Sequence, residues 1–306
     1  MISNPPDPMA GLVSRMGQLS PPLRWVIAAR VKTLSLSLMP VIAGSWLAAT
    51  MGAWRPDVAL AAGGASAAIQ VGTNLWNDAA DAKSGVDGPE RLGPPRLTSL
   101  GLLDPARVRQ VAAGSFLVAV LLGLYLVSLG GWPIVAIGFI SLAMGFFYSM
   151  GPRPLSGTPL GELLVIAFFG VIAVAGTVYL HGQPLIAPVY ALGLIMGLPA
   201  AAILMINNHR DRATDKRAGR RTLAIQIGEM PSRIVYVLLI LMSLAGGVWF
   251  AGCAASFIPA AGLGVWLSAA MIRTPISTRL NQLIPGTALF QILLLVGTMG
   301  GQMICG

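Results

Sequence analysis

Long apolar stretches recur along almost the whole chain, and they constrain its fold more than any other feature. Each runs for about 20 residues, enough for a helix to cross a bilayer core of roughly 30 Å. Of the 306 residues, 55% are hydrophobic and only 10% are charged. Soluble domains usually carry about a quarter charged residues. We therefore expect an all-α, polytopic membrane protein.

The apolar runs between charge clusters predict nine membrane spans. They lie at 33–52, 58–77, 110–129, 132–150, 160–180, 186–206, 234–252, 255–272 and 285–304. If the N-terminus is cytoplasmic, that side holds 19 of the 20 Lys and Arg residues, and Arg55 is the exception. Basic residues favour cytoplasmic loops. The charges therefore predict nine spans in the cell (inner) membrane, with the N-terminus inside and the C-terminus outside.

Neither the net charge nor the cysteines indicate a further partner. The charge of +9 comes without interleaved basic and aromatic residues, so we expect no nucleic acid, and we infer no obligate protein partner. Cys253 and Cys305 lie in apolar, glycine-flanked surroundings. We expect two small buried side chains there rather than a disulfide or a metal site.

Acidic residues gather directly after the second apolar run, in the segment NLWNDAADAKSGVDGPERLGPPR (74–96). Its pattern is repeated after the sixth run, in NNHRDRATDKRAGRRTLA (207–224). The first copy has Asn77, then Asp81 four residues on, then Asp87; the second has Asn207, Asp211 and Asp215 in the same order. We expect pseudo-repeats over about 25–159 and 160–284, followed by a ninth helix. Together they form one transmembrane domain over 25–306, after a polar segment over 1–24.

The spacing of the acids indicates a metal site. Asp78 and Asp81 are three residues apart, and Asp211 and Asp215 are four apart, so each pair lies on one side of a helix. Paired carboxylates repel unless a cation lies between them, and Mg²⁺ typically takes one or two carboxylates together with substrate phosphates. Nearby basic residues suit the outer oxygens of a diphosphate. They are Lys83, Lys216, Arg217, Arg220 and Arg221.

The location of this site indicates its substrate. A diphosphate site at the membrane–cytosol boundary suits a polyprenyl diphosphate, whose tail enters the bundle and whose leaving group Mg²⁺ stabilises. We expect neither His181 nor His209 to be catalytic. A membrane transporter is the distant alternative, but a transport route needs polar groups at mid-membrane. Here only Glu162 lies close to the start of a span.

At these residues the chain resembles the UbiA superfamily of intramembrane aromatic prenyltransferases. It is most similar to the MenA branch, which prenylates 1,4-dihydroxy-2-naphthoate in menaquinone biosynthesis. The resemblance covers nearly the whole chain, including FFYSMGPRPL (146–155) and LGELLVIAFFGVIAVAGTVYL (160–180). It implies a polyprenyltransferase with nine helices around a central cavity that opens to the cytoplasm.

The resemblance also implies the roles of individual residues. Catalysis falls to Asp78, Asp81, Asp211 and Asp215. The Mg²⁺–diphosphate set is Asn77, Asp78, Asp81, Asp87, Asn207, Asp211 and Asp215. Lys83, Arg217 and Arg221 become diphosphate partners by proximity to those motifs. Tyr148 is a pocket residue in the family pattern, and an interfacial tyrosine is the alternative.

The acceptor is expected to be an aromatic acid. Decarboxylating prenylation of dihydroxynaphthoate needs a cation for the carboxylate, and Arg30, Lys32 and Arg153 have no obvious diphosphate role. Alternatively, Arg30 and Lys32 only set topology and bind lipid phosphates. Ala79 and Ala80 stand where the branch usually has bulky aromatics, which leaves room for a bicyclic ring. The alternative acceptor is 4-hydroxybenzoate or another quinone precursor.

Overall fold

The computed structural model describes residues 8–84, 92–94, 96–149 and 157–305, with side chains at 13–80, 92–94, 96–143 and 157–305. Every regular element in these ranges is helical, which confirms the all-α prediction. The chain starts with α1 (Pro8–Gly17), α2 (Pro21–Ala28) and the 3-10 turn η1 (Val31–Thr33). The long helices of the first half are α3 (Ser35–Thr50), α4 (Pro56–Ser84), α5 (Pro105–Gly130) and α6 (Trp132–Ser149).

A second set of helices completes the bundle. A continuous helical stretch consists of α7 (Gly161–Ile166), the π-helical turn η3 (Ala167–Ile172) and α8 (Ala173–Leu180). It is followed by α9 (Ala187–Arg210), α12 (Glu229–Ala251), α13 (Ile258–Arg273) and α14 (Leu283–Cys305). Short elements connect them: α10 (Arg212–Arg217), α11 (Leu223–Ile227), η4 (Ala254–Phe257) and η5 (Thr278–Gln282).

Seven helical segments among the described residues are long and apolar enough to cross a membrane. The count is eight if Pro21–Thr33 and Ser35–Thr50, which are bent by 51° relative to each other, form one span. In α6 the apolar part described is the shorter stretch Trp132–Ala143. The protein is therefore a multi-pass membrane protein, as the composition predicts.

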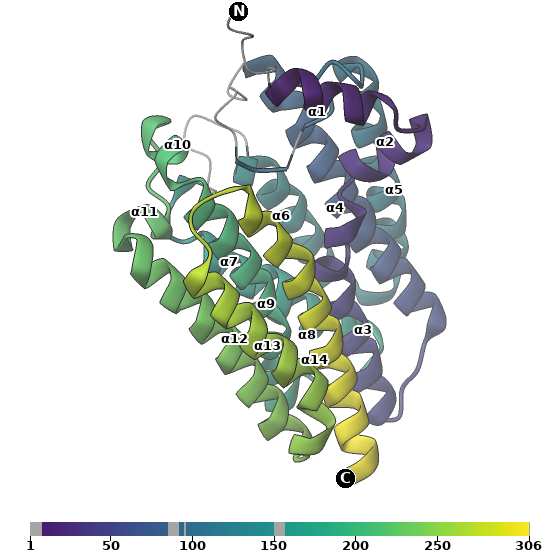
Figure 1. Ribbon diagram of the computed structural model, residues 1–306. Helices are drawn as coiled ribbons and strands as arrows, with labels where there is room; N and C mark the ends of the chain where they lie inside the picture. The colour runs from purple at the N-terminus through teal and green to yellow at the C-terminus, as the bar shows by residue number, and fades with distance from the viewer. Residues whose placement is uncertain (1–7, 85–91, 95, 150–156, 306) are drawn as a thin grey trace, which may run out of the picture.

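Helix α9 lies at the centre of the bundle and positions the second Asp-rich motif at its end. It packs against α3, α7, η3, α8, α12 and α14 (Figure 1). Gly170 of η3 lies directly against the backbone of Gly193 and Gly197 of α9. Small residues at helix crossings let backbones approach closely in membranes. Gly170 therefore serves helix packing.

Local sequence signals fix where the helices begin and end. The Asp104 carboxylate accepts hydrogen bonds from the backbone N–H groups of Ala106 and Arg107, and Pro105 occupies the first turn of α5. Arg233 of α12 donates from Nη1 to the carbonyls of Met271, Ile272 and Thr274, which end α13. A buried arginine thus satisfies carbonyls that the helix itself leaves unpaired.

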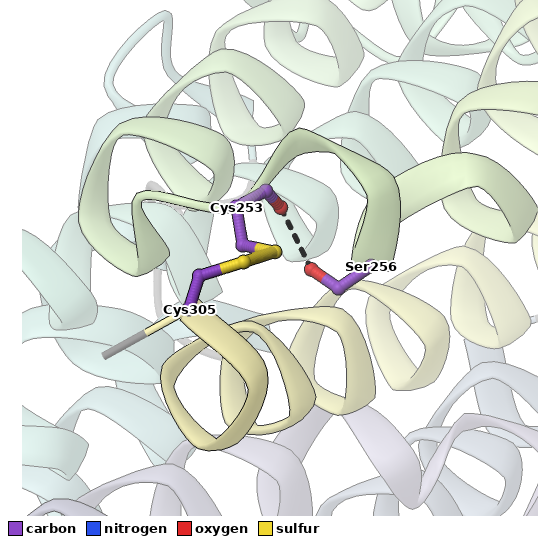
Figure 2. Close-up of a disulfide and its surroundings, with 3 residues drawn as sticks. All are labelled: Cys253, Ser256 and Cys305. Atoms are coloured by element: carbon purple, nitrogen blue, oxygen red, sulfur yellow. Dashed lines mark hydrogen bonds between the residues drawn. A yellow bond between two sulfur atoms is a disulfide. The ribbon is translucent and has the colours of Figure 1, made fainter.

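The ends of the bundle differ. Helices α1, α2 and α10 lie at one end, and α14 finishes at the other (Figure 1). At the α14 end, Cys253 and Cys305 form a disulfide, with Cα atoms 5.8 Å apart (Figure 2). The expectation of two buried, unpaired cysteines is therefore wrong. Cys305 is exposed in the last turn of α14 and reaches Cys253, which lies between α12 and η4.

Candidate functional site

The first Asp-rich motif begins on the last turns of α4. Asp78 is only 3% exposed. Both of its carboxylate oxygens are buried, and neither has a hydrogen-bond partner among the described residues. The following segment holds the backbone of this turn: Thr98 Oγ1 donates to Asp78 O at 2.6 Å, and Arg96 Nη1 donates to Asn77 O at 3.2 Å. Asp78 thus offers a fixed carboxylate that can coordinate a cation.

Two arginines act on this carboxylate. The charges of Arg30 and Arg96 both interact with Asp78. Burial, together with the charge of Arg30, lowers the pKa of the Arg96 guanidinium to about 10. Arg30 has φ 53°, the only positive φ at a non-glycine residue in the described chain. A left-handed arginine is strained, and such residues persist where the surroundings enforce them, often at functional sites.

The second motif spans the junction of α9 and α10. The Asp215 N–H donates to Asp211 O at 2.8 Å, so the two residues stand one helical turn apart, as their spacing predicts. Arg210 makes a bidentate contact with Asp211: Nε donates to Oδ1 at 2.8 Å and Nη2 donates to Oδ2 at 2.6 Å. Arg220 Nη1 donates to Asp215 Oδ1 at 2.9 Å. Burial raises the pKa of the Asp215 carboxyl, and the charge of Arg220 counteracts this.

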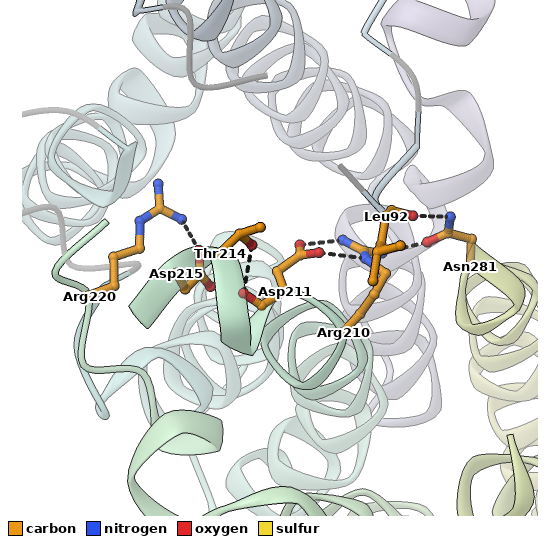
Figure 3. Close-up of polar contacts among 7 residues, drawn as sticks. All are labelled: Leu92, Arg210, Asp211, Thr214, Asp215, Arg220 and Asn281. Atoms are coloured by element: carbon orange, nitrogen blue, oxygen red, sulfur yellow. Dashed lines mark hydrogen bonds and ion pairs between the residues drawn. The ribbon is translucent and has the colours of Figure 1, made fainter. Parts of the chain in front are cut away.

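The two motifs lie at the same end of the bundle and share partners. Arg96 interacts electrostatically with Asp78 of the first motif and with Asp211 of the second. Figure 3 shows the second connection: Arg210 Nη1 donates to Asn281 Oδ1 at 2.6 Å, and Asn281 Nδ2 donates to Leu92 O at 2.8 Å. The site is therefore a cluster of opposite charges drawn from α4, α9, α10 and the connections after α4 and α13.

The donor set fits a hard divalent cation accompanied by an anion. Asp78 has two buried carboxylate oxygens that no described residue satisfies with a hydrogen bond. Among the described side chains, no three His, Cys, Asp or Glu residues lie close enough to hold a metal by themselves. Mg²⁺ does not need such a cage, because one or two carboxylates and substrate phosphates complete its octahedron. Arginines beside the carboxylates supply the positive charge that a diphosphate requires.

The structure does not describe the side chains of several predicted site residues. Asp87 and Arg153 lie outside the described residues. The backbone of Asp81 and Lys83 belongs to α4 and that of Tyr148 to α6, but their side chains are not described.

The remaining predicted residues divide by exposure. Asn77 and Asn207 are half-buried beside their aspartates. Lys32, Arg217 and Arg221 are exposed. The Arg221 N–H donates to Gly157 O at 2.7 Å, which anchors the segment after α10 to the turn before α7.

Arg96, Arg210 and Asn281 belong to the site but were not predicted from the sequence. Arg210 had a signal, since it immediately precedes Asp211 and an arginine there can fork onto the carboxylate. Asn281 had none, because its partners lie 71 and 189 residues away along the chain. A second missed group is the buried pair of Asn208 and Glu162, whose Nδ2 and Oε1 atoms are 2.9 Å apart.

The family whose sequence pattern matches the chain is the UbiA prenyltransferase family, over residues 37–283. The chain belongs to this family. Its relatives include proteins named 1,4-dihydroxy-2-naphthoate octaprenyltransferase. The one from Mycobacterium tuberculosis is 35% identical over 216 residues, covering 70% of this chain and 73% of the relative. The one from Escherichia coli is 33% identical over 233 residues, covering 74% and 76%.

Solved structures of the family share the fold. A UbiA homologue from Archaeoglobus fulgidus, bound to DMAPP and Mg²⁺, superposes with a TM-score of 0.60 at 12% identity. The match covers 92% of this chain and 99% of the homologue. A homologue from Aeropyrum pernix gives 0.61 at 15% identity, covering 86% and 97%. These likenesses confirm the helical architecture expected from the resemblance, and family membership leaves the transporter alternative without support.

Proposed function

We propose that this protein transfers a polyprenyl group from a polyprenyl diphosphate to 1,4-dihydroxy-2-naphthoate, with loss of CO₂, on the route to demethylmenaquinone. The observation that carries this is the pairing of Asp78, whose buried carboxylate accepts no hydrogen bond from the described residues, with an Asp211–Asp215 motif at the same end of a membrane bundle. The names of the naphthoate-specific relatives support the acceptor.

The carboxylates and amides of the two motifs would hold Mg²⁺, which would neutralise the inner oxygens of the diphosphate. These are Asn77, Asp78, Asp81, Asp87, Asn207, Asp211 and Asp215. Bound there, Mg²⁺ would stabilise the negative charge that develops on the departing diphosphate. Lys83, Arg217 and Arg221 are proposed partners of the outer oxygens. Arg96 and Arg220 join them, because both lie within the charge cluster of the site.

The reaction is an exchange of CO₂ for the prenyl group. The allylic C–O bond breaks, and its electron pair leaves with the diphosphate. A C–C bond forms between the allylic carbon and the ring carbon that bears the carboxylate. The carboxylate then departs as CO₂, and its bonding electrons restore the aromatic ring. The apolar bundle keeps water from the allylic cation, which water would otherwise capture.

Acceptor binding is assigned to cations that have no proposed diphosphate role. Arg30 suits the carboxylate of the naphthoate, because its guanidinium acts on Asp78 and its strained backbone is held by the α2–η1 joint. Asn74 of α4 supports that joint by donating to Ala29 O at 3.0 Å. Lys32, Arg153 and Tyr148 complete the proposed pocket. Ala79 has no exposed surface and packs among Ala28, Leu75 and Leu97, so it leaves no room for a ring. Space for a fused ring is therefore proposed beside Ala80 alone, which is partly exposed.

We also propose nine spans around a central cavity, the N-terminus in the cytoplasm and the site open to the cytoplasmic side of the cell (inner) membrane. The proposed units are the polar segment 1–24 and the domain 25–306, with pseudo-repeats over 25–159 and 160–284. The disulfide supports this orientation, because disulfides persist in oxidising compartments. Cys253 and Cys305 lie at the end of the bundle opposite the basic loops.

The proposal is tested by comparing the activities of two purified variants, Asp78→Asn and Asp104→Asn. Both changes remove one carboxylate near the same membrane surface, but Asp104 caps α5, and asparagine caps equally well. With Mg²⁺, a polyprenyl diphosphate and dihydroxynaphthoate, we expect product from Asp104→Asn and almost none from Asp78→Asn. EDTA should abolish turnover by the unchanged protein. Full activity of Asp78→Asn, or full activity in EDTA, would contradict the proposed site.

A further inference from the structure

Asn281 belongs to neither Asp-rich motif. Its amide contacts Arg210, which binds Asp211 of the second motif, and Leu92, which lies in the segment after the first motif. Its Oδ1 accepts from Arg210, and its Nδ2 donates to the carbonyl of Leu92 (Figure 3). A planar amide carries an acceptor and two donors, so one asparagine can serve both partners at once. The amide sits in η5, the turn that precedes α14.

Arg210 transmits this contact to Asp211. It is 4% exposed, and three of its nitrogens donate to fixed acceptors, two on Asp211 and one on Asn281. The guanidinium therefore cannot turn without breaking at least one charge-assisted bond. A carboxylate has about four lone-pair positions, of which this contact uses two. The Asp211 side chain is 28% exposed, so an open face is left for a cation.

The other end of the bridge reaches the first motif. Arg96 and Thr98 follow Leu92 by four and six residues. They hold the backbone carbonyls of Asn77 and Asp78. The Asn281 amide therefore connects Arg210, the partner of Asp211, to the segment that holds the backbone of Asp78. Groups that orient metal ligands from behind commonly decide how well the metal binds.

We propose that Asn281 is a positioning residue that sets the orientation of Asp211 in the diphosphate site through Arg210. The inference rests on the proposed function, since it concerns how the metal–diphosphate unit is held. Asn281 touches no reacting atom of the proposed prenyl transfer. Its loss should weaken binding of metal and diphosphate more than it slows the chemical step at saturation.

Calorimetric titration of the full-length protein with inorganic diphosphate in saturating Mg²⁺ tests this without turnover. Asn281→Leu keeps the side-chain volume and removes both hydrogen bonds, so the dissociation constant should rise about tenfold. Asn281→Asp keeps the acceptor for Arg210 and replaces the donor to Leu92 by a second anionic oxygen. Because the contact with Arg210 is retained, binding should stay within about threefold of the unchanged protein. Gln282→Leu makes the same amide-to-leucine change at the exposed neighbouring position and should bind normally.

Kinetics provide the second readout. The KM for polyprenyl diphosphate should rise in Asn281→Leu while kcat stays within about threefold, and Asn281→Asp should restore KM. Equal binding by Asn281→Leu and the unchanged protein would overturn the inference and leave the proposed function standing. So would a tenfold loss in Asn281→Asp, which decides the matter if Asn281→Leu does not fold. Failure of the unchanged protein to bind diphosphate with Mg²⁺ would instead refute the proposed function.

Discussion

Replacing Gly170 by alanine should destabilise the bundle, although the same change usually stabilises a helix. A Cβ at Gly170 would lie 2.7 Å from Gly197 Cα and 2.9 Å from Gly197 N. Non-bonded carbon atoms prefer about 3.5–4.0 Å, so η3 and α9 would have to separate by roughly 1 Å. Only backbone atoms line this contact, so no side chain can turn away to relieve it.

The two opposing effects set the magnitude. Overpacking of a tight core costs about 1–3 kcal/mol, and this contact belongs near the upper limit because two backbones must move. The gain in helix propensity from Gly to Ala is about 1 kcal/mol. The net destabilisation is therefore about 2 kcal/mol, which lowers the midpoint of thermal unfolding by a few degrees.

Gly123→Ala on α5 is the matched control, because a Cβ there meets nothing within 4 Å. It should leave the unfolding temperature unchanged or raise it slightly. Thermal unfolding of both purified variants in one detergent, at one scan rate, measures the difference. If Gly170→Ala unfolds at or above the temperature of the unchanged protein, the close approach of η3 and α9 is refuted.

Three further changes probe the site, the orientation and the disulfide. Asp211→Asn should lower turnover by about 100-fold or more while the unfolding temperature is kept, since even indirect metal-site substitutions cost 10–100-fold; turnover near normal would remove Asp211 from the site. In a cysteine-free background, Arg217→Cys, at an exposed position of α10, should react with a membrane-impermeant thiol reagent only from the cytoplasm and Gly182→Cys only from outside, and the reverse pattern would invert the proposed topology. Cys305→Ser should lower stability by about 2–5 kcal/mol and keep the activity, because the disulfide lies at the far end from the charge cluster; unchanged stability would contradict a structural role for it.

The class of fold could be predicted from the sequence because its signals are local. Runs of apolar residues and the repeated Asn–Asp spacing lie within single segments. Helices form along these runs, although only seven or eight of the described segments are long and apolar enough to cross a membrane. The Asp215–Asp211 backbone bond confirms the spacing of the second motif. Helix ends shifted where polar residues continue a helix, as in α4, which extends to Ser84 and carries the start of the first motif.

Contacts between distant segments could not be predicted. Asn281 meets Arg210 and Leu92 only because η5 is folded back over the end of α9, and no spacing encodes that. The pairing of Cys253 with Cys305 was missed for a related reason. Apolar, glycine-rich surroundings look alike for a buried thiol and for a disulfide at the end of a helix, and the two residues are separated by 52 positions.

The central claim is decarboxylating prenylation of a naphthoate. Its most direct test supplies purified protein with Mg²⁺, a polyprenyl diphosphate and dihydroxynaphthoate labelled at the carboxyl carbon, and counts released CO₂ against prenylated product. We predict one CO₂ for each product molecule, with little or no product from 4-hydroxybenzoate in a parallel reaction. Prenylated product that retains the label, or a preference for 4-hydroxybenzoate, would contradict the naphthoate assignment.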